Sequence, residues 1–549
     1  MTHSRADLVF TGGPVFTGDA VRPGTLAVRD GRILALGGPG EAAEHIGPRT
    51  EVVDLKGTLL VPGFQDAHIH PVSGGVELGQ CDLTGAVTPD AYRCRIRTYA
   101  EAHPELPWIT GGGWSLEAFP GGTPTRQFLD ALVPDRPVYL VNRDHHGGWA
   151  NTRALERVGL TAASADPADG RIEREDDGTP SGTLQEGAMS LVAAHVPAPT
   201  QDELTEGLLR AQRLLHSYGV TAWQDALLGT HGGMADPAPA YREAARRGLL
   251  TARVSGALWW ERGRGTGQLP ELLARSAELN GLAGGRLRAR TVKIMLDGIA
   301  ENHTAALLAP YRTGCGCTPH RGLSFFTPEE LAEAVVLLDA EGLQAHFHAL
   351  GDRAVREALD AVGAARTANG PTGTRPHLAH LQVVHPDDVP RFRELGATAN
   401  IQALWAAHEP QMDELTIPFL GPERAARQYP FGDLLRSGAT LAAGSDWPVS
   451  SPDPLAALHV AVNRRLPGAS SPVFLPEQRI GLGAALAAYT AGSAHVNHLD
   501  DTGTLRPGNL ADLAVLDRDP FAGPPEEIAS ARVLQTFVGG ERVHAAEDA

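Results

Sequence analysis

The sequence predicts an α/β fold: a (β/α)8 TIM barrel, a small β-sandwich domain formed by both ends of the chain, and an insertion after the first barrel strand. Three observations lead to this prediction. A strand-then-helix rhythm, typical of parallel βα units, repeats between about residues 200 and 470. Short strands punctuated by Gly, Asp and Pro fill both ends of the chain. After the first barrel strand, a Gly-rich stretch that contains Trp residues interrupts the alternation of strands and helices.

The barrel strands are expected where short apolar segments precede helical patterns. The first is LLVPGFQDAHIH at residues 59–70. The other seven candidates are residues 219–226, 251–258, 288–298, 343–350, 375–382, 397–402 and 440–446. One helix is marked clearly, because Thr327, Pro328 and Glu330 form the start of a capping box before apolar residues at helical spacing.

These patterns predict three parts. The β-sandwich domain takes residues 1–62 and 495–549, so the two termini are expected to meet, and the barrel takes residues 63–494. Residues 71–200 are inserted after the first barrel strand. Because active sites of such barrels lie at the carboxyl ends of the strands, an insertion there is expected to form a lid or a substrate wall.

Composition restricts the function. The 549 residues are 42% hydrophobic and 20% charged, which is typical of a soluble globular enzyme. A formal charge of −18 disfavours nucleic acid and anionic membranes, so a small-molecule substrate is expected. The N-terminal segment lacks the pattern of a signal peptide, and we therefore expect a cytoplasmic protein. Four cysteines, Cys81, Cys94, Cys315 and Cys317, are too few for a disulfide framework.

Histidines and an aspartate fall near the carboxyl ends of predicted strands. Alternation places His68 and His70 on one side of the first strand, able to face one ion. His348, His380 and Asp446 lie near the ends of three further strands. Any one of these histidines alone could be a hydrogen-bonded core residue. Together they favour a metal site, since imidazole and carboxylate are ligands that suit zinc and its neighbours.

Lys293 lies within the predicted strand TVKIMLDG, where a cationic side chain needs a partner if it points inward. A salt bridge and a surface-directed lysine remain the alternatives.

The chain resembles the amidohydrolase superfamily, in particular the YtcJ-like amidohydrolase 3 group that includes N-substituted formamide deformylases. The motifs that carry the resemblance span nearly the whole chain: VPGFQDAHIHP, RDHHGGWANTRAL, VKIMLDGIAENHTAALLAPY, HALGDRAV, HLAHLQVVHPDDVPRF, AAGSDWPV and GTLRPGNLADLAVLDRDP. The resemblance implies hydrolysis of a non-peptide C–N bond, such as that of an N-formyl or N-acyl amine. It also implies a homodimer, as in many relatives.

The resemblance assigns roles within the metal site. It implies two divalent ions, expected to be Zn2+ although other metals could serve, bridged by a carboxylated Lys293. His68, His70 and Asp446 would bind one ion, and His348 and His380 the other. Water activated by metal would attack the carbonyl carbon, because coordination lowers its pKa. Asp446 would carry the proton from this water to the leaving nitrogen.

The insertion resembles the family's substrate wall. Trp114, His146, Trp149 and Glu186 are candidate substrate-binding residues, and His146 could also polarise the scissile carbonyl as a catalytic residue. His145 stands where the family commonly has glycine, which questions the local backbone. Alternatively, these residues order the inserted segment. Asp297 and Glu301 follow Lys293 and could contact substrate or hold their loop.

Two competing functions remain open from the sequence. A lactonase, esterase or deaminase could use the same metal site, because fold does not fix substrate. A non-catalytic, amidohydrolase-like protein is the other alternative, although loss of metal ligands would be its mark and all the expected ligand positions are filled.

Overall fold

The structure is a computed structural model that describes residues 5–18, 20–38, 40–231, 234–312 and 320–547. Its centre is a barrel of eight parallel strands in chain order. These are β6 (Phe64–Ile69), β13 (Val220–Leu228), β14 (Arg253–Trp259), β15 (Leu287–Met295), β16 (Gln344–Ala349), β17 (His377–His380), β18 (Thr398–Ile401) and β19 (Leu441–Ala443). The predicted (β/α)8 barrel is therefore confirmed, with shorter strands than the sequence pattern suggested.

The barrel closes between its last and first strands. The amide of Asp446 donates to the carbonyl of His68 over 2.8 Å, and the amide of Ser445 donates to the Asp66 carboxylate over 3.1 Å. These bonds draw the segment after β19 against β6. Residues at opposite ends of the chain's barrel region thus become neighbours.

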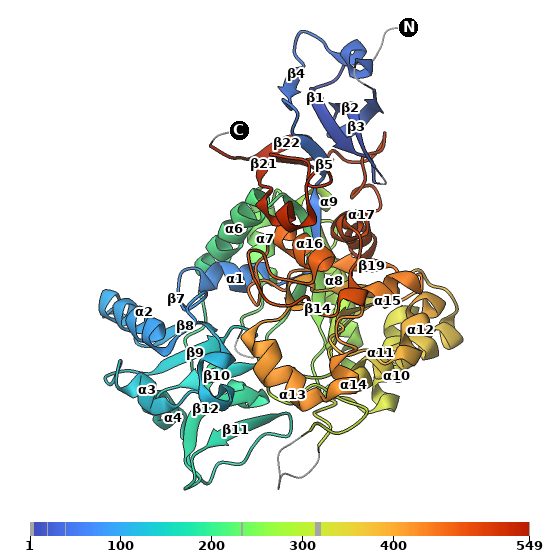
Figure 1. Ribbon diagram of the computed structural model, residues 1–549. Helices are drawn as coiled ribbons and strands as arrows, with labels where there is room; N and C mark the ends of the chain where they lie inside the picture. Colours follow the sequence, from blue (N-terminus) through green and yellow to red (C-terminus); the bar gives the residue numbers. More distant parts are fainter. Residues whose placement is uncertain (1–4, 19, 39, 232–233, 313–319, 548–549) are drawn as a thin grey trace.

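Helices surround the barrel (Figure 1). The main ones are α6 (Gln201–Ser217), α7 (Ala238–Arg246), α8 (Leu269–Leu279), α10 (Pro328–Ala340), α11 (Asp352–Asn369), α12 (Val389–Leu395), α15 (Phe431–Arg436) and α16 (Pro454–Asn463). The capping box expected before α10 is present, with the Thr327 hydroxyl accepting from the Glu330 amide and the Glu330 carboxylate accepting from the Thr327 amide. Buried Leu331, Val335 and Leu338 then face the core.

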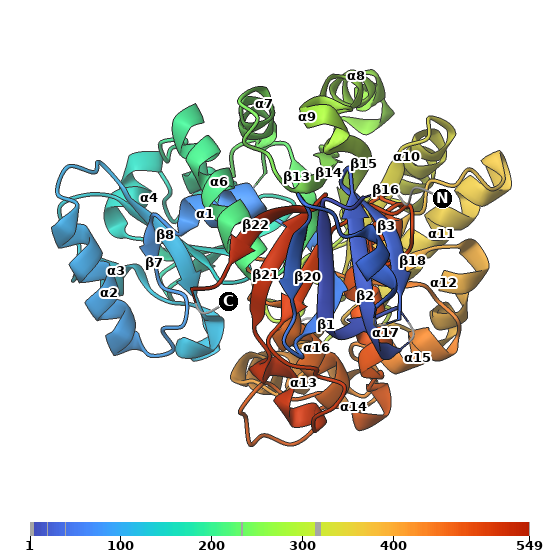
Figure 2. The ribbon, with the colours of Figure 1, turned by 90° about the horizontal axis from the view of Figure 1, so that it is seen from above.

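Both ends of the chain build one β-rich domain (Figures 1 and 2). Its strands run in the order β22-β21-β20-β5-β1-β2-β3, with β4 beside β1. The N-terminal strands are β1 (Leu8–Phe16), β2 (Val21–Arg29), β3 (Arg32–Gly37), β4 (Glu51–Asp54) and β5 (Leu59–Pro62), and the C-terminal strands are β20 (Leu513–Leu516), β21 (Val533–Val538) and β22 (Glu541–Ala545). The join is antiparallel, with Val515 opposite Leu60. A single predicted strand at 59–70 is in fact β5 in this domain and β6 in the barrel.

The insertion folds around a sheet of its own, beside the barrel (Figures 1 and 2). The strand order is β11-β12-β10-β9-β8-β7. The strands are β7 (Cys81–Asp82), β8 (Ile109–Trp114), β9 (Val138–Asn142), β10 (Gly147–Ala150), β11 (Gly170–Arg174) and β12 (Pro180–Glu186), and the helices include α2 (Pro89–Ala102), α3 (Arg126–Asp130) and α4 (Thr152–Val158). This sheet has its own buried cluster of apolar side chains, so the insertion is a packed unit rather than a loop.

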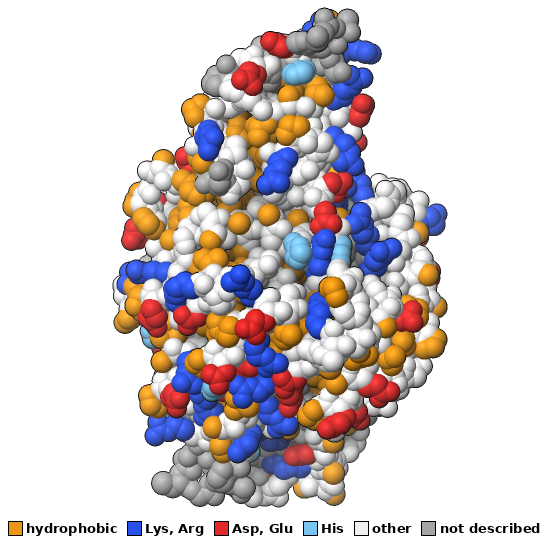
Figure 3. Space-filling view, turned by 90° about the vertical axis from the view of Figure 1, so that its right-hand side faces the viewer, with side chains coloured by type: hydrophobic (Ala, Val, Ile, Leu, Met, Phe, Trp, Pro, Cys, Tyr) orange, Lys and Arg blue, Asp and Glu red, His pale blue; other side chains and the backbone are white. Residues whose placement is uncertain are grey.

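Charged side chains of both signs are interspersed over the face seen in Figure 3. Within the part of the chain that the structure describes, no helix has both the length and the apolarity needed to cross a membrane. Cys81 is a buried free thiol and Cys94 an exposed one, whereas Cys315 and Cys317 lie outside the described residues.

Candidate metal centre and active site

Three of the expected ligands form a compact group at the junction of the first and last barrel strands. His68, His70 and Asp446 each offer a ligand atom, and these atoms all lie within 4.8 Å of one another. The Nε2 atoms of His68 and His70 are each 3.2 Å from Oδ1 of Asp446. The closure of the barrel therefore brings together residues nearly 380 positions apart in sequence.

Lys293 reaches the same place from β15. Its Nζ is 3.2 Å from Nε2 of His68, and the side chain is almost completely buried. Burial lowers the pKa of Lys293 to about 7, although the nearby Asp446 carboxylate acts in the opposite direction. A substantial share of this amine is thus neutral near pH 7, which is the form that reacts with CO2.

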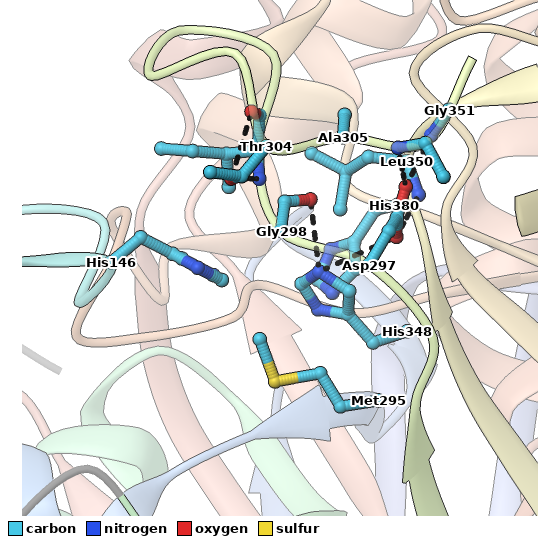
Figure 4. A network of polar contacts seen from close by, with 12 residues as sticks. His146, Met295, Asp297, Gly298, Thr304, Ala305, His348, Leu350, Gly351 and His380 are labelled. Atoms are coloured by element: carbon cyan, nitrogen blue, oxygen red, sulfur yellow. Dashed lines mark hydrogen bonds and ion pairs between the residues drawn. The ribbon is translucent and has the colours of Figure 1, made fainter. Parts of the chain in front are cut away.

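His348 and His380 complete the cluster from β16 and β17. Their ring centroids are 4.5 Å apart, and the His380 ring is 4.7 Å from that of His68. His380 Nδ1 lies 3.9 Å from Oδ2 of Asp446, and His348 Nε2 lies 3.4 Å from the Gly298 carbonyl. Figure 4 shows these two imidazoles side by side. All six expected ligands therefore lie in one region, with the first three packed most tightly.

The residues fit a divalent metal. Both ring nitrogens of His380 are buried without a hydrogen-bond partner among the described residues. Buried polar atoms without partners are costly, and a bound cation would satisfy them. Imidazole nitrogens and a carboxylate form the donor set that zinc and related metals use.

Two residues of the cluster have strained backbones. His380 and Asp446 have φ angles of 81° and 56°, in the left-handed region that side chains rarely adopt. Strain of this kind costs on the order of 1–3 kcal/mol and concentrates at functional sites. Burial opposes ionisation of Asp446, yet His68 and His70 hold its pKa well below the usual range, so this carboxylate is charged.

The sequence reasoning missed residues that orient the cluster. His346 Nε2 lies 2.8 Å from Nδ1 of His68, which leaves Nε2 of His68 facing Lys293 and Asp446. The carboxylate of Asp66 accepts from the amides of His68 and Ser445, fixing the two strand ends together. The spacing of His346 and His348 in QAHFHAL repeats that of His68 and His70, and this signal could have revealed His346.

The insertion contributes an ion pair beside the cluster. His146 Nδ1 lies 2.9 Å from Glu186, whose carboxylate also accepts from the hydroxyl of Thr304 over 2.7 Å. Although burial opposes protonation, Glu186 raises the pKa of His146 to about 9. The His146 ring lies 5.3 Å from that of His348, with which it shares the view in Figure 4. A protonated imidazole thus lies beside His348, one of the histidines expected to bind metal.

His145, which stands where the family commonly has glycine, has an unusual backbone conformation. Its φ is 64°, a conformation that glycine adopts without cost. Its Nε2 lies 3.5 Å from Glu77, so the side chain is held at the wall of the site.

Trp114 and Trp149 do not line the site. Both are fully buried in the core of the insertion, with ring centroids 5.9 Å apart. Their indole N–H groups donate to the carbonyls of Leu140 and Thr125. The prediction that these two tryptophans contact substrate is therefore wrong. Both rings point into the core of the insertion, where they pack against each other and against neighbouring phenylalanines.

Asp297 is likewise an anchor rather than a substrate contact. It is fully buried and accepts from the amides of Ala306, Leu350 and Gly351, as Figure 4 shows in part. These bonds tie the loop after β15 to the end of β16. Asp297 therefore holds this loop in place and does not make the predicted substrate contact. Glu301, on the same loop, does line the cavity.

A cavity of about 990 Å³ opens over the cluster. The expected metal ligands line it, together with His146, Glu186 and Glu301. This volume lies at the upper end of the range for small-molecule sites. The cavity thus lies at the carboxyl ends of the barrel strands, where enzymes with this fold have their active sites.

The chain belongs to the amidohydrolase family, whose sequence profile matches residues 51–544. The predicted family is thereby confirmed, and the protein is a hydrolase of this generally metal-dependent family. Three curated relatives are similar along nearly the whole chain. They are the protein LONG AFTER FAR-RED 3 of Arabidopsis thaliana (32% identical, 98% of this chain and 92% of that protein), the putative amidohydrolase YtcJ of Bacillus subtilis (28%, 98% and 99%) and the N-substituted formamide deformylase of Arthrobacter pascens (28%, 98% and 98%).

A solved structure shares the architecture. The chain superposes on an uncharacterized metal-dependent hydrolase from Pyrococcus horikoshii with a TM-score of 0.72 and 26% identity, covering 94% of this chain and 99% of that one.

Proposed function

We propose that this protein hydrolyses a non-peptide C–N bond, with an N-formyl or N-acyl amine as substrate, at a binuclear metal centre. The observation that carries the proposal is the compact group of His68, His70 and Asp446 beside the buried Lys293, at the floor of the cavity. Similarity to the N-substituted formamide deformylase supports an amide as the substrate class.

The metal would be held by His68, His70, Lys293, His348, His380 and Asp446, with Zn2+ the expected ion. When bound, it would polarise the carbonyl and lower the pKa of water towards 7. Lys293 would serve as a bridging ligand after its neutral amine adds to CO2, releasing one proton and forming a carbamate.

Side chains of the protein itself would transfer the proton and stabilise the developing charge on the carbonyl oxygen. The Asp446 carboxylate is ionised and can take a proton on an oxygen, then return it to the leaving nitrogen, which otherwise departs as a poor anion. The protonated His146 can donate to the carbonyl oxygen as negative charge develops there. Glu186 would position His146 by accepting from its Nδ1.

The composition of the chain makes the carbamate directly testable. Lysine occurs only twice, as the exposed Lys56 and the buried Lys293. With ¹³C-labelled bicarbonate, we expect one carbamate resonance, absent from Lys293→Ala and retained in Lys56→Arg. Metal bound per chain and hydrolysis of N-formyl and N-acyl amines should fall with it in Lys293→Ala alone.

A folded wild type that binds no metal and cleaves no carbonyl compound would refute the proposal. Faster hydrolysis of a lactone, ester or amidine than of any amide would move the function to the corresponding alternative. Light scattering on the same sample would test the predicted homodimer.

A further inference from the structure

A group of apolar side chains lines the cavity beside the metal site. Leu227, Trp259 and Met295, on β13, β14 and β15, form one buried cluster, and the partly buried Met234 and Phe325 pack against it. All of these except Phe325 line the cavity. A molecule in the cavity can therefore contact this surface, and we call Leu227, Met234, Trp259 and Met295 the apolar wall.

The pairing of the barrel strands places the apolar wall next to the expected metal ligands. Met295 is opposite His348 on β16, and Trp259 is opposite Lys293 on β15. Paired residues on neighbouring strands are about 5 Å apart at their Cα atoms. Alternation also puts Met295 on the same face of β15 as Lys293. In Figure 4 the Met295 side chain points toward the space between the rings of His146 and His348.

The groups that border the apolar wall are uncharged or already paired. The His231 ring lies 4.3 Å from that of Trp259, and burial lowers the pKa of His231 to about 3, so this imidazole is neutral. Arg262 Nη2 is 3.7 Å from Sδ of Met295, but the guanidinium forms an ion pair with Asp169 over 3.2 Å. A charged substituent placed here would lose water without gaining an unpaired counter-ion, whereas an apolar substituent would be stabilised by burial.

The order of the barrel strands indicates which part of a substrate reaches the apolar wall. Counted from β6, β15 is the fourth strand and β19 the eighth, so Met295 and Asp446 lie on opposite sides of the closed barrel. In the proposed function, Asp446 returns a proton to the leaving nitrogen, which places the amine part of the amide on the β19 side. Because the acyl chain and the nitrogen leave the carbonyl carbon in different directions, the acyl chain extends towards β15.

We propose that the apolar wall binds the acyl chain of the substrate, so that the protein hydrolyses N-acyl amines with an apolar acyl chain in preference to formamides or acetamides. This inference rests on the proposed function for the reaction itself. A formyl group carries only a hydrogen atom at this position and would leave the apolar wall in contact with water.

The test keeps the leaving amine constant and varies the acyl chain. N-acetyl-4-nitroaniline and N-hexanoyl-4-nitroaniline release the same coloured amine. Each buried methylene group contributes about fourfold, so we expect wild type to favour the hexanoyl compound by at least about tenfold in kcat/KM. Leu227→Asn puts a polar amide into the apolar wall and should lower this preference by at least about fivefold. Met234→Gln, at a less buried position, should lower it in the same direction.

Leu404→Asn is the matched control, because Leu404 also lines the cavity but follows β18, which is not adjacent to β13, β14 or β15. It should keep the hexanoyl preference of wild type. No such preference in wild type, a preference that the folded Leu227→Asn and Met234→Gln variants retain, or its loss in Leu404→Asn would overturn the inference. Unfolding temperatures of the three variants exclude a general loss of structure.

A second pair of substrates tests the assignment to the acyl side. N-methylacetamide and N-hexylacetamide share the acyl group and differ in the amine. Leu227→Asn should leave the ratio of their kcat/KM values unchanged. A change in this ratio, with the acyl preference intact, would assign the apolar wall to the amine part and contradict the inference.

Calorimetric binding of acetate and hexanoate to the zinc-loaded protein separates the two proposals, because these carboxylates bind without turnover. We expect wild type to bind hexanoate at least about tenfold more tightly than acetate, and Leu227→Asn to lose most of this difference. If this pattern holds but no amide is cleaved, the proposed function fails and the binding site for the acyl chain stands. If the two carboxylates bind equally to wild type, the binding site fails whether or not amides are cleaved.

Discussion

Replacement of Asp446 by asparagine should stop catalysis without unfolding the protein. Asp446 has a φ of 56°, and asparagine tolerates this left-handed conformation better than other side chains do. The backbone bond from its amide to the His68 carbonyl is unaffected by the change. What is lost is a charged oxygen that lies 3.2 Å from both His68 and His70 and that can accept a proton.

The expected loss follows from the role of the proton. General acid–base catalysis contributes about 10²–10⁴-fold, which corresponds to about 2.7–5.4 kcal/mol of barrier. We therefore expect kcat on an N-formyl amine, measured with Zn2+ in excess, to fall by about that factor. Asp453→Asn is the control, since Asp453 caps α16 and asparagine caps equally well. Near-wild-type turnover of Asp446→Asn would refute the role given to Asp446.

Two further predictions concern stability. Trp149→Ala should destabilise the insertion by about 3–5 kcal/mol, seen as a lower unfolding temperature and faster proteolysis, because Trp149 is fully buried; normal stability with a raised KM would contradict this packing role. Burial raises the pKa of Asp225 from its ordinary value of 3.8 to about 7, so folding favours its protonated form and stability should fall as pH rises from about 4 to about 7. Asp225→Asn removes this contribution. The unfolding temperature of the variant minus that of wild type should therefore increase from pH 5 to pH 8. A difference that stays constant would show that Asp225 does not titrate there.

The sequence by itself predicted the barrel, the shared domain of the two termini and the six residues expected to bind metal, which the structure brings into one region. Each prediction used local information, namely apolar segments of strand length, turn residues between them, and histidines or aspartate at strand ends. Because every parallel strand delivers its carboxyl end to the same rim, a ligand-type residue there is placed without knowledge of side-chain contacts.

Only the tertiary structure decided which polar and aromatic residues face the cavity. Trp149 and Glu186 lie on neighbouring strands of the insertion, yet one is buried in its core and the other faces the cavity. Asp297 and Glu301 are four residues apart on one loop, and backbone amides surround the first while the second faces the cavity. Whether a residue faces the cavity or is buried in the protein depends on how its sheet or loop packs against distant segments. That information is not contained in the local sequence.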